Sequence, residues 1–177
     1  MNVALTGFMG CGKTTYGREA AERAGVRFAD LDDAVLEAYN TAFPDAQCGS
    51  ITDIFKVKGE GFFRSLETDT LLQLLTGDGS LVLALGGGAV VREENRAVLK
   101  AHCRLVWLRC SLGTCLENIA ATYPRPLLQG KTEAQIEELF EIRNGIYASV
   151  ADAVIDTDGL SYGEIADRIA EQLTIRN

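Results

Sequence analysis

The nine residues GFMGCGKTT, from Gly7 to Thr15, constrain the fold of this chain more than any other stretch. They satisfy the pattern G-x-x-x-x-G-K-[ST], with a short apolar run, Val3–Thr6, before them and a helical pattern, Lys13–Ala24, after them. In this arrangement the glycines let backbone N–H groups close around phosphate oxygens, and the helix N-terminus adds its partial positive charge. The pattern therefore predicts a strand, a loop and a helix that together bind a nucleoside triphosphate.

The residues beside the glycines carry the expected chemistry. Lys13 is placed to reach the β- and γ-phosphates, and the Thr14 hydroxyl is placed to ligate Mg²⁺. Cys11 lies inside the loop near a helix N-terminus, so we expect the pKa of its thiol to be lowered. The alternative interpretation is a glycine-rich turn that binds nothing.

Short apolar runs alternate with helical patterns along the rest of the chain. A helix is predicted over Lys13–Ala24 with its end at Gly25, and the capping boxes Thr132–Gln135 and Ser161–Glu164 each predict the start of a further helix. Buried strands are predicted at Val3–Thr6, Arg27–Ala29, Leu81–Leu85, Leu105–Leu108 and Ala153–Ile155. Strands separated by helices of this length indicate an α/β fold, in which a parallel sheet has helices on both faces.

Length, charge and cysteine content limit the class of protein. A chain of 177 residues without a linker rich in Pro, Gly or Ser predicts one domain, residues 1–177. The formal net charge of −8 argues against nucleic-acid binding, because phosphate backbones call for basic surfaces. No apolar run approaches the roughly 18 residues that a membrane span needs, so no membrane partner is expected. Five cysteines without a CxxC pair indicate reduced thiols and a cytoplasmic protein. A monomer is the default expectation, because the sequence identifies no surplus apolar surface.

An arginine interrupts an apolar helical stripe in the last third of the chain. The stripe comprises Ile136, Leu139, Phe140, Arg143 and Tyr147. A guanidinium group in such a stripe is costly unless an anion meets it, so Arg143 is predicted to bind an anion. The alternative is a helix that ends near Gly145, in which Arg143 would be a last-turn cation that interacts with the helix dipole.

A second arginine has a similar setting. On a helical wheel of residues 59–75, Arg64 projects between Leu71 and Leu75. Glu67 lies three residues further on, where its carboxylate can hold the guanidinium group. The alternative is an ordinary ion pair at a helix edge. Two arginines that both point inward suit the bidentate capture of a carboxylate.

Carboxylates gather at the end of the second predicted strand, in the sequence FADLDD. Alternation places Asp30 and Asp32 on one side of an extended segment. There, one carboxylate would hold Mg²⁺ through water and the other would accept hydrogen bonds from a hydroxyl group. Asp33 fits the acidic first turn of a helix, which is also the alternative for the whole group.

A third arginine lies in the irregular stretch 121–131. Pro124 and Pro126 stiffen the backbone on both sides of Arg125. This suits a mobile lid that brings a cation to a transferring phosphate. A plain surface loop is the alternative.

These pieces together resemble the shikimate kinase family. The resemblance covers nearly the whole chain, and the joint order of its motifs is far more specific than any one of them. The motifs are GFMGCGKTT, DLD, GEGFFRSLE, LGGGAV, RPLL and RNGIY before VIDT. The resemblance implies a three-layer α/β/α fold whose five-stranded parallel sheet has the order 2-3-1-4-5, similar to that of nucleoside monophosphate kinases. It also implies ATP-dependent phosphorylation of shikimate at its 3-hydroxyl, a step in chorismate and aromatic amino-acid biosynthesis.

The resemblance also assigns roles to residues. It implies that ATP is bound by Gly10, Cys11, Gly12, Lys13, Thr14, Thr15 and Arg125. It implies that shikimate is surrounded by Asp32, Arg64, Gly86, Gly87, Gly88 and Arg143. Mg²⁺ is implied at Thr14 and Asp30, and catalysis is implied for Lys13, Asp32 and Arg125. Residues 31–76 would form the substrate-binding region and residues 121–131 the lid.

The chain also departs from the family pattern. Ala84 stands where members often carry Ser or Thr near the waters of the metal, residues 118–123 hold no basic side chain to pack on adenine, and Asn40–Gly49 is longer than expected. Two further hypotheses therefore stay open. One is a non-catalytic binding module of the same fold, and the other is a P-loop kinase for another small hydroxy acid, such as gluconate, or for a nucleotide.

Overall fold

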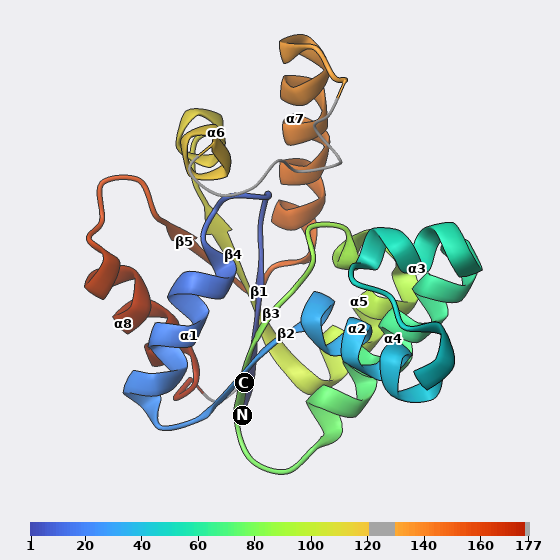
Figure 1. The fold of residues 1–177 in the computed structure, drawn as a ribbon. Coiled ribbons are helices and arrows are strands. Elements are labelled where there is room, and N and C mark those ends of the chain that lie inside the picture. Colours follow the sequence, from blue (N-terminus) through green and yellow to red (C-terminus); the bar gives the residue numbers. More distant parts are fainter. Residues whose placement is uncertain (121–129, 176–177) are drawn as a thin grey trace.

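The computed structural model describes residues 1–120 and 130–175, and its centre is a five-stranded parallel sheet (Figure 1). The strand order is β2-β3-β1-β4-β5, which confirms the expected order. The strands are β1 (Asn2–Thr6), β2 (Arg27–Asp30), β3 (Leu81–Ala84), β4 (Cys103–Arg109) and β5 (Ala153–Asp156). Each coincides with a predicted apolar run to within one or two residues at its ends, the usual uncertainty of an element boundary.

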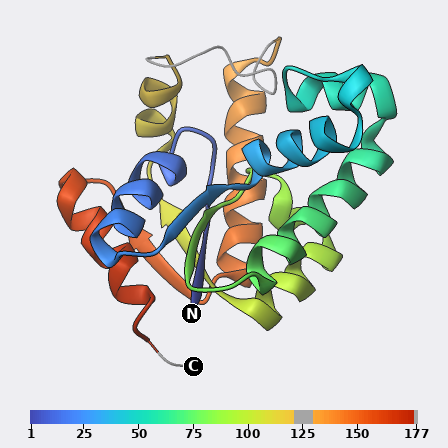
Figure 2. The same ribbon diagram turned by 60° about the horizontal axis from the view of Figure 1, so that its bottom comes forward.

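Helices cover both faces of the sheet, as predicted (Figures 1 and 2). On one face α1 (Lys13–Ala24) packs against α8 (Tyr162–Gln172). On the other face lie α5 (Glu93–His102) and α7 (Glu133–Val150). To one side of the sheet, α2 (Leu31–Ala42), α3 (Ile51–Lys58) and α4 (Glu60–Thr76) pack together, with α4 also against α5. The remaining helix, α6 (Leu112–Ala120), follows β4, and in the part of the chain described here no helix is long and apolar enough to cross a membrane.

The central strand β1 determines where a ligand can bind. Its residues Val3, Ala4 and Leu5 are fully buried, because β3 and β4 flank the strand and helices cover both faces. The parallel pairing brings the last residues of β1, β2 and β3 to the same edge of the sheet. The chain crosses from β3 to β4 past β1, so the strand order reverses there. Ligands of open α/β sheets bind at this kind of edge, beyond the carboxyl ends of the strands.

Several predicted helix ends are confirmed. Gly25 ends α1 in the left-handed conformation, with φ of 64°. Thr132 and Gln135 form a complete capping box at the start of α7, and Ser161 and Glu164 form another at the start of α8.

Helix α7 does not end near Gly145 but continues to Val150. The alternative interpretation of Arg143 as a last-turn cation is therefore wrong. On the same stripe Tyr147 is buried, and Leu139 and Phe140 pack against the core, so Arg143 does lie on the inward face of the helix.

The long segment between α2 and α3 is closed by one side chain. After Ala42 the chain makes a short 3₁₀ turn, Pro44–Ala46. The Asn40 amide donates to the carbonyl of Cys48 at 3.0 Å and accepts from the N–H of Cys48 at 2.8 Å. This double contact joins the end of α2 to the approach to α3, so the extra residues form a compact loop.

Candidate active site

The loop after β1 closes on the first turn of α1. Gly12 is the N-cap residue of α1, with φ of 88° and ψ of 16°, a left-handed conformation that glycine adopts at no steric cost. No side chain caps this helix. Its first N–H groups are therefore available to an anion in the loop. The Lys13 ammonium group folds back over the same loop and donates to the carbonyls of Gly7 at 2.8 Å and Phe8 at 3.1 Å.

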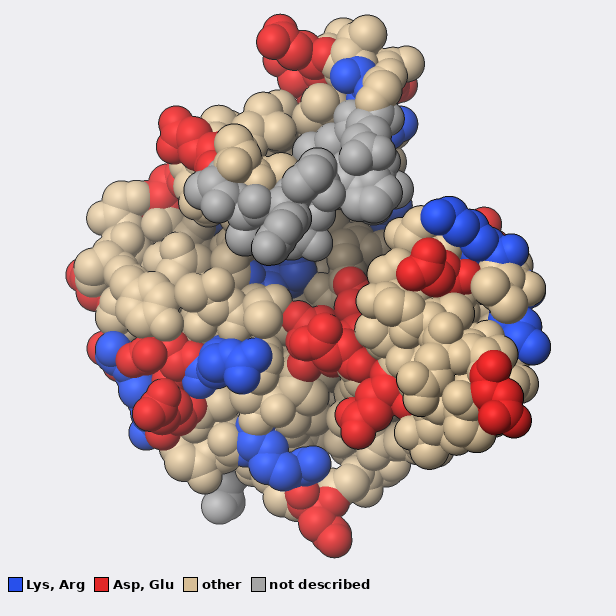
Figure 3. Space-filling model, viewed as in Figure 1, with Lys and Arg blue, Asp and Glu red and all other residues tan. Residues whose placement is uncertain are grey.

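A cavity of 560 Å³ opens between this loop and the ends of β2 and β3. Figure 3 shows the hollow in the middle of this face, where basic and acidic side chains lie close together. The cavity is lined by most of the residues predicted for the nucleotide and the metal, namely Gly10, Gly12, Lys13, Thr14, Thr15 and Asp30. Asp32, Gly86 and Gly87, predicted to contact the second substrate, line it as well.

Asp30 uses its two carboxylate oxygens for different contacts. Oδ1 accepts a hydrogen bond from the N–H of Asp32 at 3.0 Å and so caps α2. Oδ2 accepts a hydrogen bond from the Thr14 hydroxyl at 2.7 Å. A hydroxyl and a carboxylate in contact beside a phosphate-binding loop supply the oxygen ligands that Mg²⁺ prefers. The predicted pair Thr14 and Asp30 therefore fits this ion.

Asp32 belongs to the first turn of α2, so Asp30 and Asp32 do not share an extended segment, although both line the cavity as expected. Its carboxylate nevertheless reaches the turn after β3, because a Cβ atom at Gly86 would lie 2.6 Å from Asp32 Oδ1. A larger residue at position 86 would displace this carboxylate. The neighbouring Asp33 lies in the acidic first turn, as predicted, and partial desolvation of its carboxyl group and the charge of Asp30 raise its pKa.

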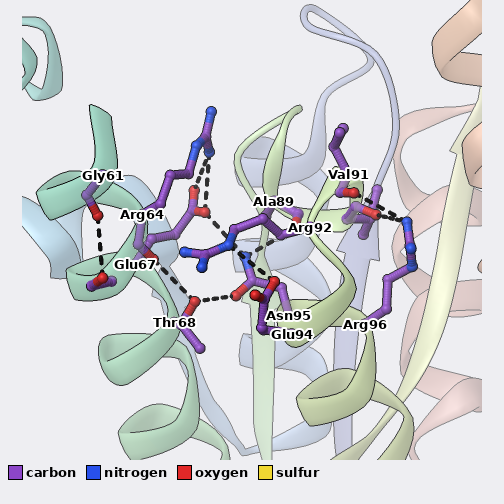
Figure 4. Close-up of polar contacts among 12 residues, drawn as sticks. Gly61, Arg64, Glu67, Thr68, Ala89, Val91, Arg92, Glu94, Asn95 and Arg96 are labelled. Carbon is purple, nitrogen blue, oxygen red and sulfur yellow. Dashed lines mark hydrogen bonds and ion pairs between the residues drawn. The ribbon is translucent and has the colours of Figure 1, made fainter. Parts of the chain in front are cut away.

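Arg64 projects from α4 and is held by Glu67, as predicted (Figure 4). Its Nη1 atom donates to both carboxylate oxygens, at 3.2 Å and 3.1 Å. The guanidinium carbon also lies 5.8 Å from the ring centre of Phe55 and 5.1 Å from that of Phe63. The buried carboxylate and the two rings hold the guanidinium group, which lies beside Gly88.

Arg143 reaches the same turn from α7. A Cβ atom at Gly88 would lie 3.7 Å from Nη2 of Arg64 and 3.9 Å from Nη1 of Arg143. This Nη1 atom of Arg143 is buried and has no hydrogen-bond partner among the described residues. A buried guanidinium N–H without an acceptor is costly, so its position favours an anionic ligand. The two arginines that were predicted to point inward therefore converge on Gly88.

Two contacts at the cavity were not predicted. The Tyr147 hydroxyl donates to the carbonyl of Gly87 at 2.9 Å and so holds the turn after β3, and burial raises the pKa of Tyr147, which keeps the hydroxyl a donor. The Asn118 amide of α6 donates to the carbonyl of Gly10 at 2.8 Å. Tyr147 carried a usable signal, since it lies one turn after Arg143 on the same stripe. Asn118 carried none, because its partner is 108 residues away in the chain.

The prediction of a lowered thiol pKa for Cys11 is wrong. The side chain is 2% exposed, and this burial raises the pKa of Cys11, although the Lys13 ammonium opposes the shift. The other cysteines are free thiols and buried as well. Arg125 lies outside the described residues, as do residues 121–129 of the expected lid, so their roles stay predictions.

A loop with the phosphate-binding pattern and two converging arginines thus share one edge of a parallel sheet. The fold and this site place the chain in the class of P-loop kinases that phosphorylate small molecules.

Comparison with known proteins narrows this class. A family model described as shikimate kinase matches residues 9–174. The shikimate kinase of Marinomonas sp. (strain MWYL1) is 38% identical over 174 residues, which are 97% of this chain and 91% of that protein. A structure of shikimate kinase from Acinetobacter baumannii in complex with shikimate superposes with a TM-score of 0.82 at 34% identity, covering 98% of this chain and 92% of that one. The chain belongs to the shikimate kinase family.

A gluconokinase from Sinorhizobium meliloti is more distant. It superposes with a TM-score of 0.56 at 14% identity, covering 98% of this chain and 91% of that one. This likeness shows a shared fold and says nothing about the substrate.

Proposed function

We propose that this protein transfers the γ-phosphoryl group of ATP to the 3-hydroxyl of shikimate, giving shikimate 3-phosphate and ADP. Membership of the shikimate kinase family supports this reaction. One observation in the structure favours a carboxylic acid as the substrate. The guanidinium groups of Arg64 and Arg143 converge on Gly88, and Arg143 has a buried N–H without an acceptor among the described residues. Shikimate is a cyclic carboxylic acid with several hydroxyl groups, so its carboxylate suits this subsite.

The arrangement orients the acid toward the nucleotide. Guanidinium groups bind carboxylates in a planar, bidentate geometry, which fixes the direction of the attached ring. With the carboxylate between Arg64 and Arg143, the hydroxyl groups of the ring face Asp32 and the phosphate-binding loop. Asp32 then accepts a hydrogen bond from the attacking hydroxyl. Such positioning contributes much of the rate in reactions that join two bound substrates.

The transfer forms one bond and breaks another. The 3-hydroxyl oxygen bonds to the γ-phosphorus as the bond from this phosphorus to the β–γ bridging oxygen breaks, and ADP leaves. The hydroxyl proton passes to Asp32 late in the step. Because the transition state is loose and its charge spreads over the phosphoryl oxygens, cations stabilise it more than a strong base would. Lys13 supplies one of these cations when its ammonium group turns from the carbonyls of Gly7 and Phe8 to the phosphates.

Thr14 and Asp30 would hold Mg²⁺, Asp30 through a water molecule. When bound, the ion would neutralise negative charge on the phosphates during the transfer. Ala84 is the register partner of Asp30 in the sheet and presents only a methyl group, so it would add no oxygen to the site.

The remaining assignments are part of the same proposal. Residues 31–76 form the substrate-binding region, because α2 carries Asp32 and α4 carries Arg64. Residues 121–131 form a lid, from which Arg125 provides a further cation to the phosphates and which excludes water from the reaction. The protein acts as a monomer in the cytoplasm, where free thiols such as those found here stay reduced.

The reaction is tested by coupled ADP release from the purified protein and Mg-ATP, with shikimate, gluconate, a nucleoside monophosphate or no acceptor. We expect ADP release to depend on shikimate. Release with gluconate or a nucleotide alone would show another kinase, and shikimate binding without any release would show a non-catalytic module. In an active enzyme, Arg64→Ala should raise the KM for shikimate far more than the KM for ATP, and equal effects on the two would contradict the assignment.

A further inference from the structure

A buried amide lies behind the subsite for the acid. Asn95 of α5 is fully buried and makes three hydrogen bonds (Figure 4). Its Nδ2 atom donates to Glu67 Oε2 at 3.0 Å and to the carbonyl of Ala89 at 2.9 Å. Its Oδ1 atom accepts a hydrogen bond from the Thr68 hydroxyl at 2.7 Å. The side chain thus connects helix α4 to the turn after β3.

These partners allow only one orientation of the amide. A carboxylate and a backbone carbonyl only accept hydrogen bonds, so both must face the NH₂ group. The remaining partner, the hydroxyl of Thr68, can donate and therefore faces the amide oxygen. Turning the amide over would place its oxygen against two other acceptors. Both N–H groups of Asn95 are used in this orientation, and no donor is left for another role.

The first of these contacts holds the counter-ion of Arg64. Glu67 is 2% exposed, and a carboxylate at such depth needs partners for its oxygens. Its Oε2 atom accepts from both Arg64 and Asn95, at 3.1 Å and 3.0 Å. The position of the Arg64 guanidinium therefore depends on where Asn95 holds Glu67.

The second contact holds the turn on which the arginines converge. Ala89 directly follows Gly88, and its carbonyl accepts from Asn95. One amide therefore ties the carboxylate behind Arg64 to the backbone beside Gly88. The connection runs from Arg64 to Glu67, from Glu67 to Asn95 and from Asn95 to Ala89, whose neighbour Gly88 lies beside Arg64.

We infer that Asn95 is a positioning residue for the acid subsite, which sets the place of the Arg64 guanidinium relative to the turn at Gly88. The inference rests on the proposed function, because Asn95 acts on the substrate only through Arg64 and this turn. A carboxylate held between two guanidinium groups is sensitive to small displacements, since misplacement by about 1 Å can cost on the order of 100-fold in rate. Loss of the amide should therefore weaken binding of the substrate acid and leave binding of the nucleotide unchanged.

The first test replaces Asn95 by an apolar residue of similar size. Asn95→Leu removes all three hydrogen bonds, and we expect the KM for shikimate to rise by at least about tenfold while the KM for ATP changes by less than about twofold. A purely structural role would lower stability and affect both substrates alike. Equal changes in the two KM values, or none, would overturn the inference.

A second pair of variants covers the case in which Asn95→Leu does not fold. Thr68→Val removes the hydroxyl that fixes the amide, at nearly unchanged volume, and should raise the KM for shikimate by about three- to fivefold. Thr70→Val is the matched control, because Thr70 is buried on the same helix but two residues further along, where side chains face a different direction. The inference fails if Thr68→Val leaves the KM for shikimate unchanged, or if Thr70→Val raises it as much.

The decisive measurement is a double-mutant cycle with Arg64→Ala. If Asn95 acts through Arg64 and the turn, the double variant Arg64→Ala/Asn95→Leu should raise the KM for shikimate clearly less than the product of the two single effects. Multiplication of the two single effects would show that Asn95 acts independently and would overturn the inference. Failure of the inference about Asn95 can be told apart from failure of the proposed function. If the proposed function is wrong, the unmodified protein shows no shikimate-dependent release of ADP.

Discussion

Arg143 shows at the scale of a single residue how this site is built before any ligand is present. Its Nη1 atom is buried on α7 without an acceptor among the described residues. Such an unpaired polar group costs stability, and under the proposed function the carboxylate of the substrate supplies the missing acceptor. A residue that lowers the stability of the free protein and serves a ligand is typical of binding sites.

The replacement Arg143→Met separates these two effects. It keeps much of the length of the side chain and removes the charge, so the free protein should be at least as stable as before. Loss of a buried charged contact to the ligand costs about 2–5 kcal/mol, so the KM for shikimate should rise by on the order of 100-fold. Thermal unfolding and steady-state kinetics measure both quantities, with Arg168→Met on the exposed face of α8 as the control. A clearly lower melting temperature with an unchanged KM would contradict this account.

Single residues also show how far sequence reasoning reaches. Arg64 and Arg143 were predictable, because each interrupts an apolar pattern whose period fixes the direction of the side chain. Cys11 was not, because its local setting at a helix N-terminus favours a lower pKa and only the folded structure shows that burial prevails. Asn95 could not be assigned from the sequence either, since two of its three partners belong to α4, nearly 30 residues away.

At the scale of elements, each helix of the site brings one part of the chemistry to the same sheet edge. Helix α1 brings Lys13 and Thr14, α2 brings Asp32, α4 brings Arg64 and α7 brings Arg143. Strands and capping boxes were predictable because they depend on neighbours within a few residues. The segment between α2 and α3 was not, because its structure depends on one side chain, Asn40, that pairs with the backbone eight residues on.

The capping box of α7 offers a test at this scale. Thr132→Ala removes the oxygen that accepts from the N–H of Gln135, and it should lower the free energy of unfolding by about 1 kcal/mol. Ser149→Ala, at an exposed position within the same helix, should be neutral or slightly stabilising, because alanine has the higher helix propensity. Urea unfolding of both variants measures this difference. Equal stabilities for the two would show that the cap contributes nothing.

At the scale of the whole molecule, buried thiol and phenol groups determine how stability changes at alkaline pH. Burial raises the pKa of the Cys103 thiol from 9.0 to about 12, and it also raises the pKa values of Cys11 and Tyr147. These groups stay protonated in the folded protein at a pH where the unfolded chain has already released their protons. Their contribution to stability is therefore complete below about pH 9 and is lost as the pH rises toward the folded-state values.

The free energy of unfolding should accordingly fall between pH 9 and pH 12. Each group with a raised pKa contributes a slope of up to about 1.4 kcal/mol per pH unit in its window. Urea unfolding at several alkaline pH values, with a reductant to keep the thiols free, measures the slope. Cys103→Val should make the slope shallower by up to one such contribution. A stability that is constant up to pH 11 would contradict the burial of these groups.

The central claim is that Arg64 and Arg143 together bind the carboxylate of shikimate beside the nucleotide. A crystal structure with shikimate, ADP and Mg²⁺ tests it most directly. We expect both guanidinium groups within about 3 Å of the carboxylate oxygens, and the 3-hydroxyl turned to Asp32 and the phosphate-binding loop. A structure in which the acid is held elsewhere while the two arginines point away from it would contradict the account.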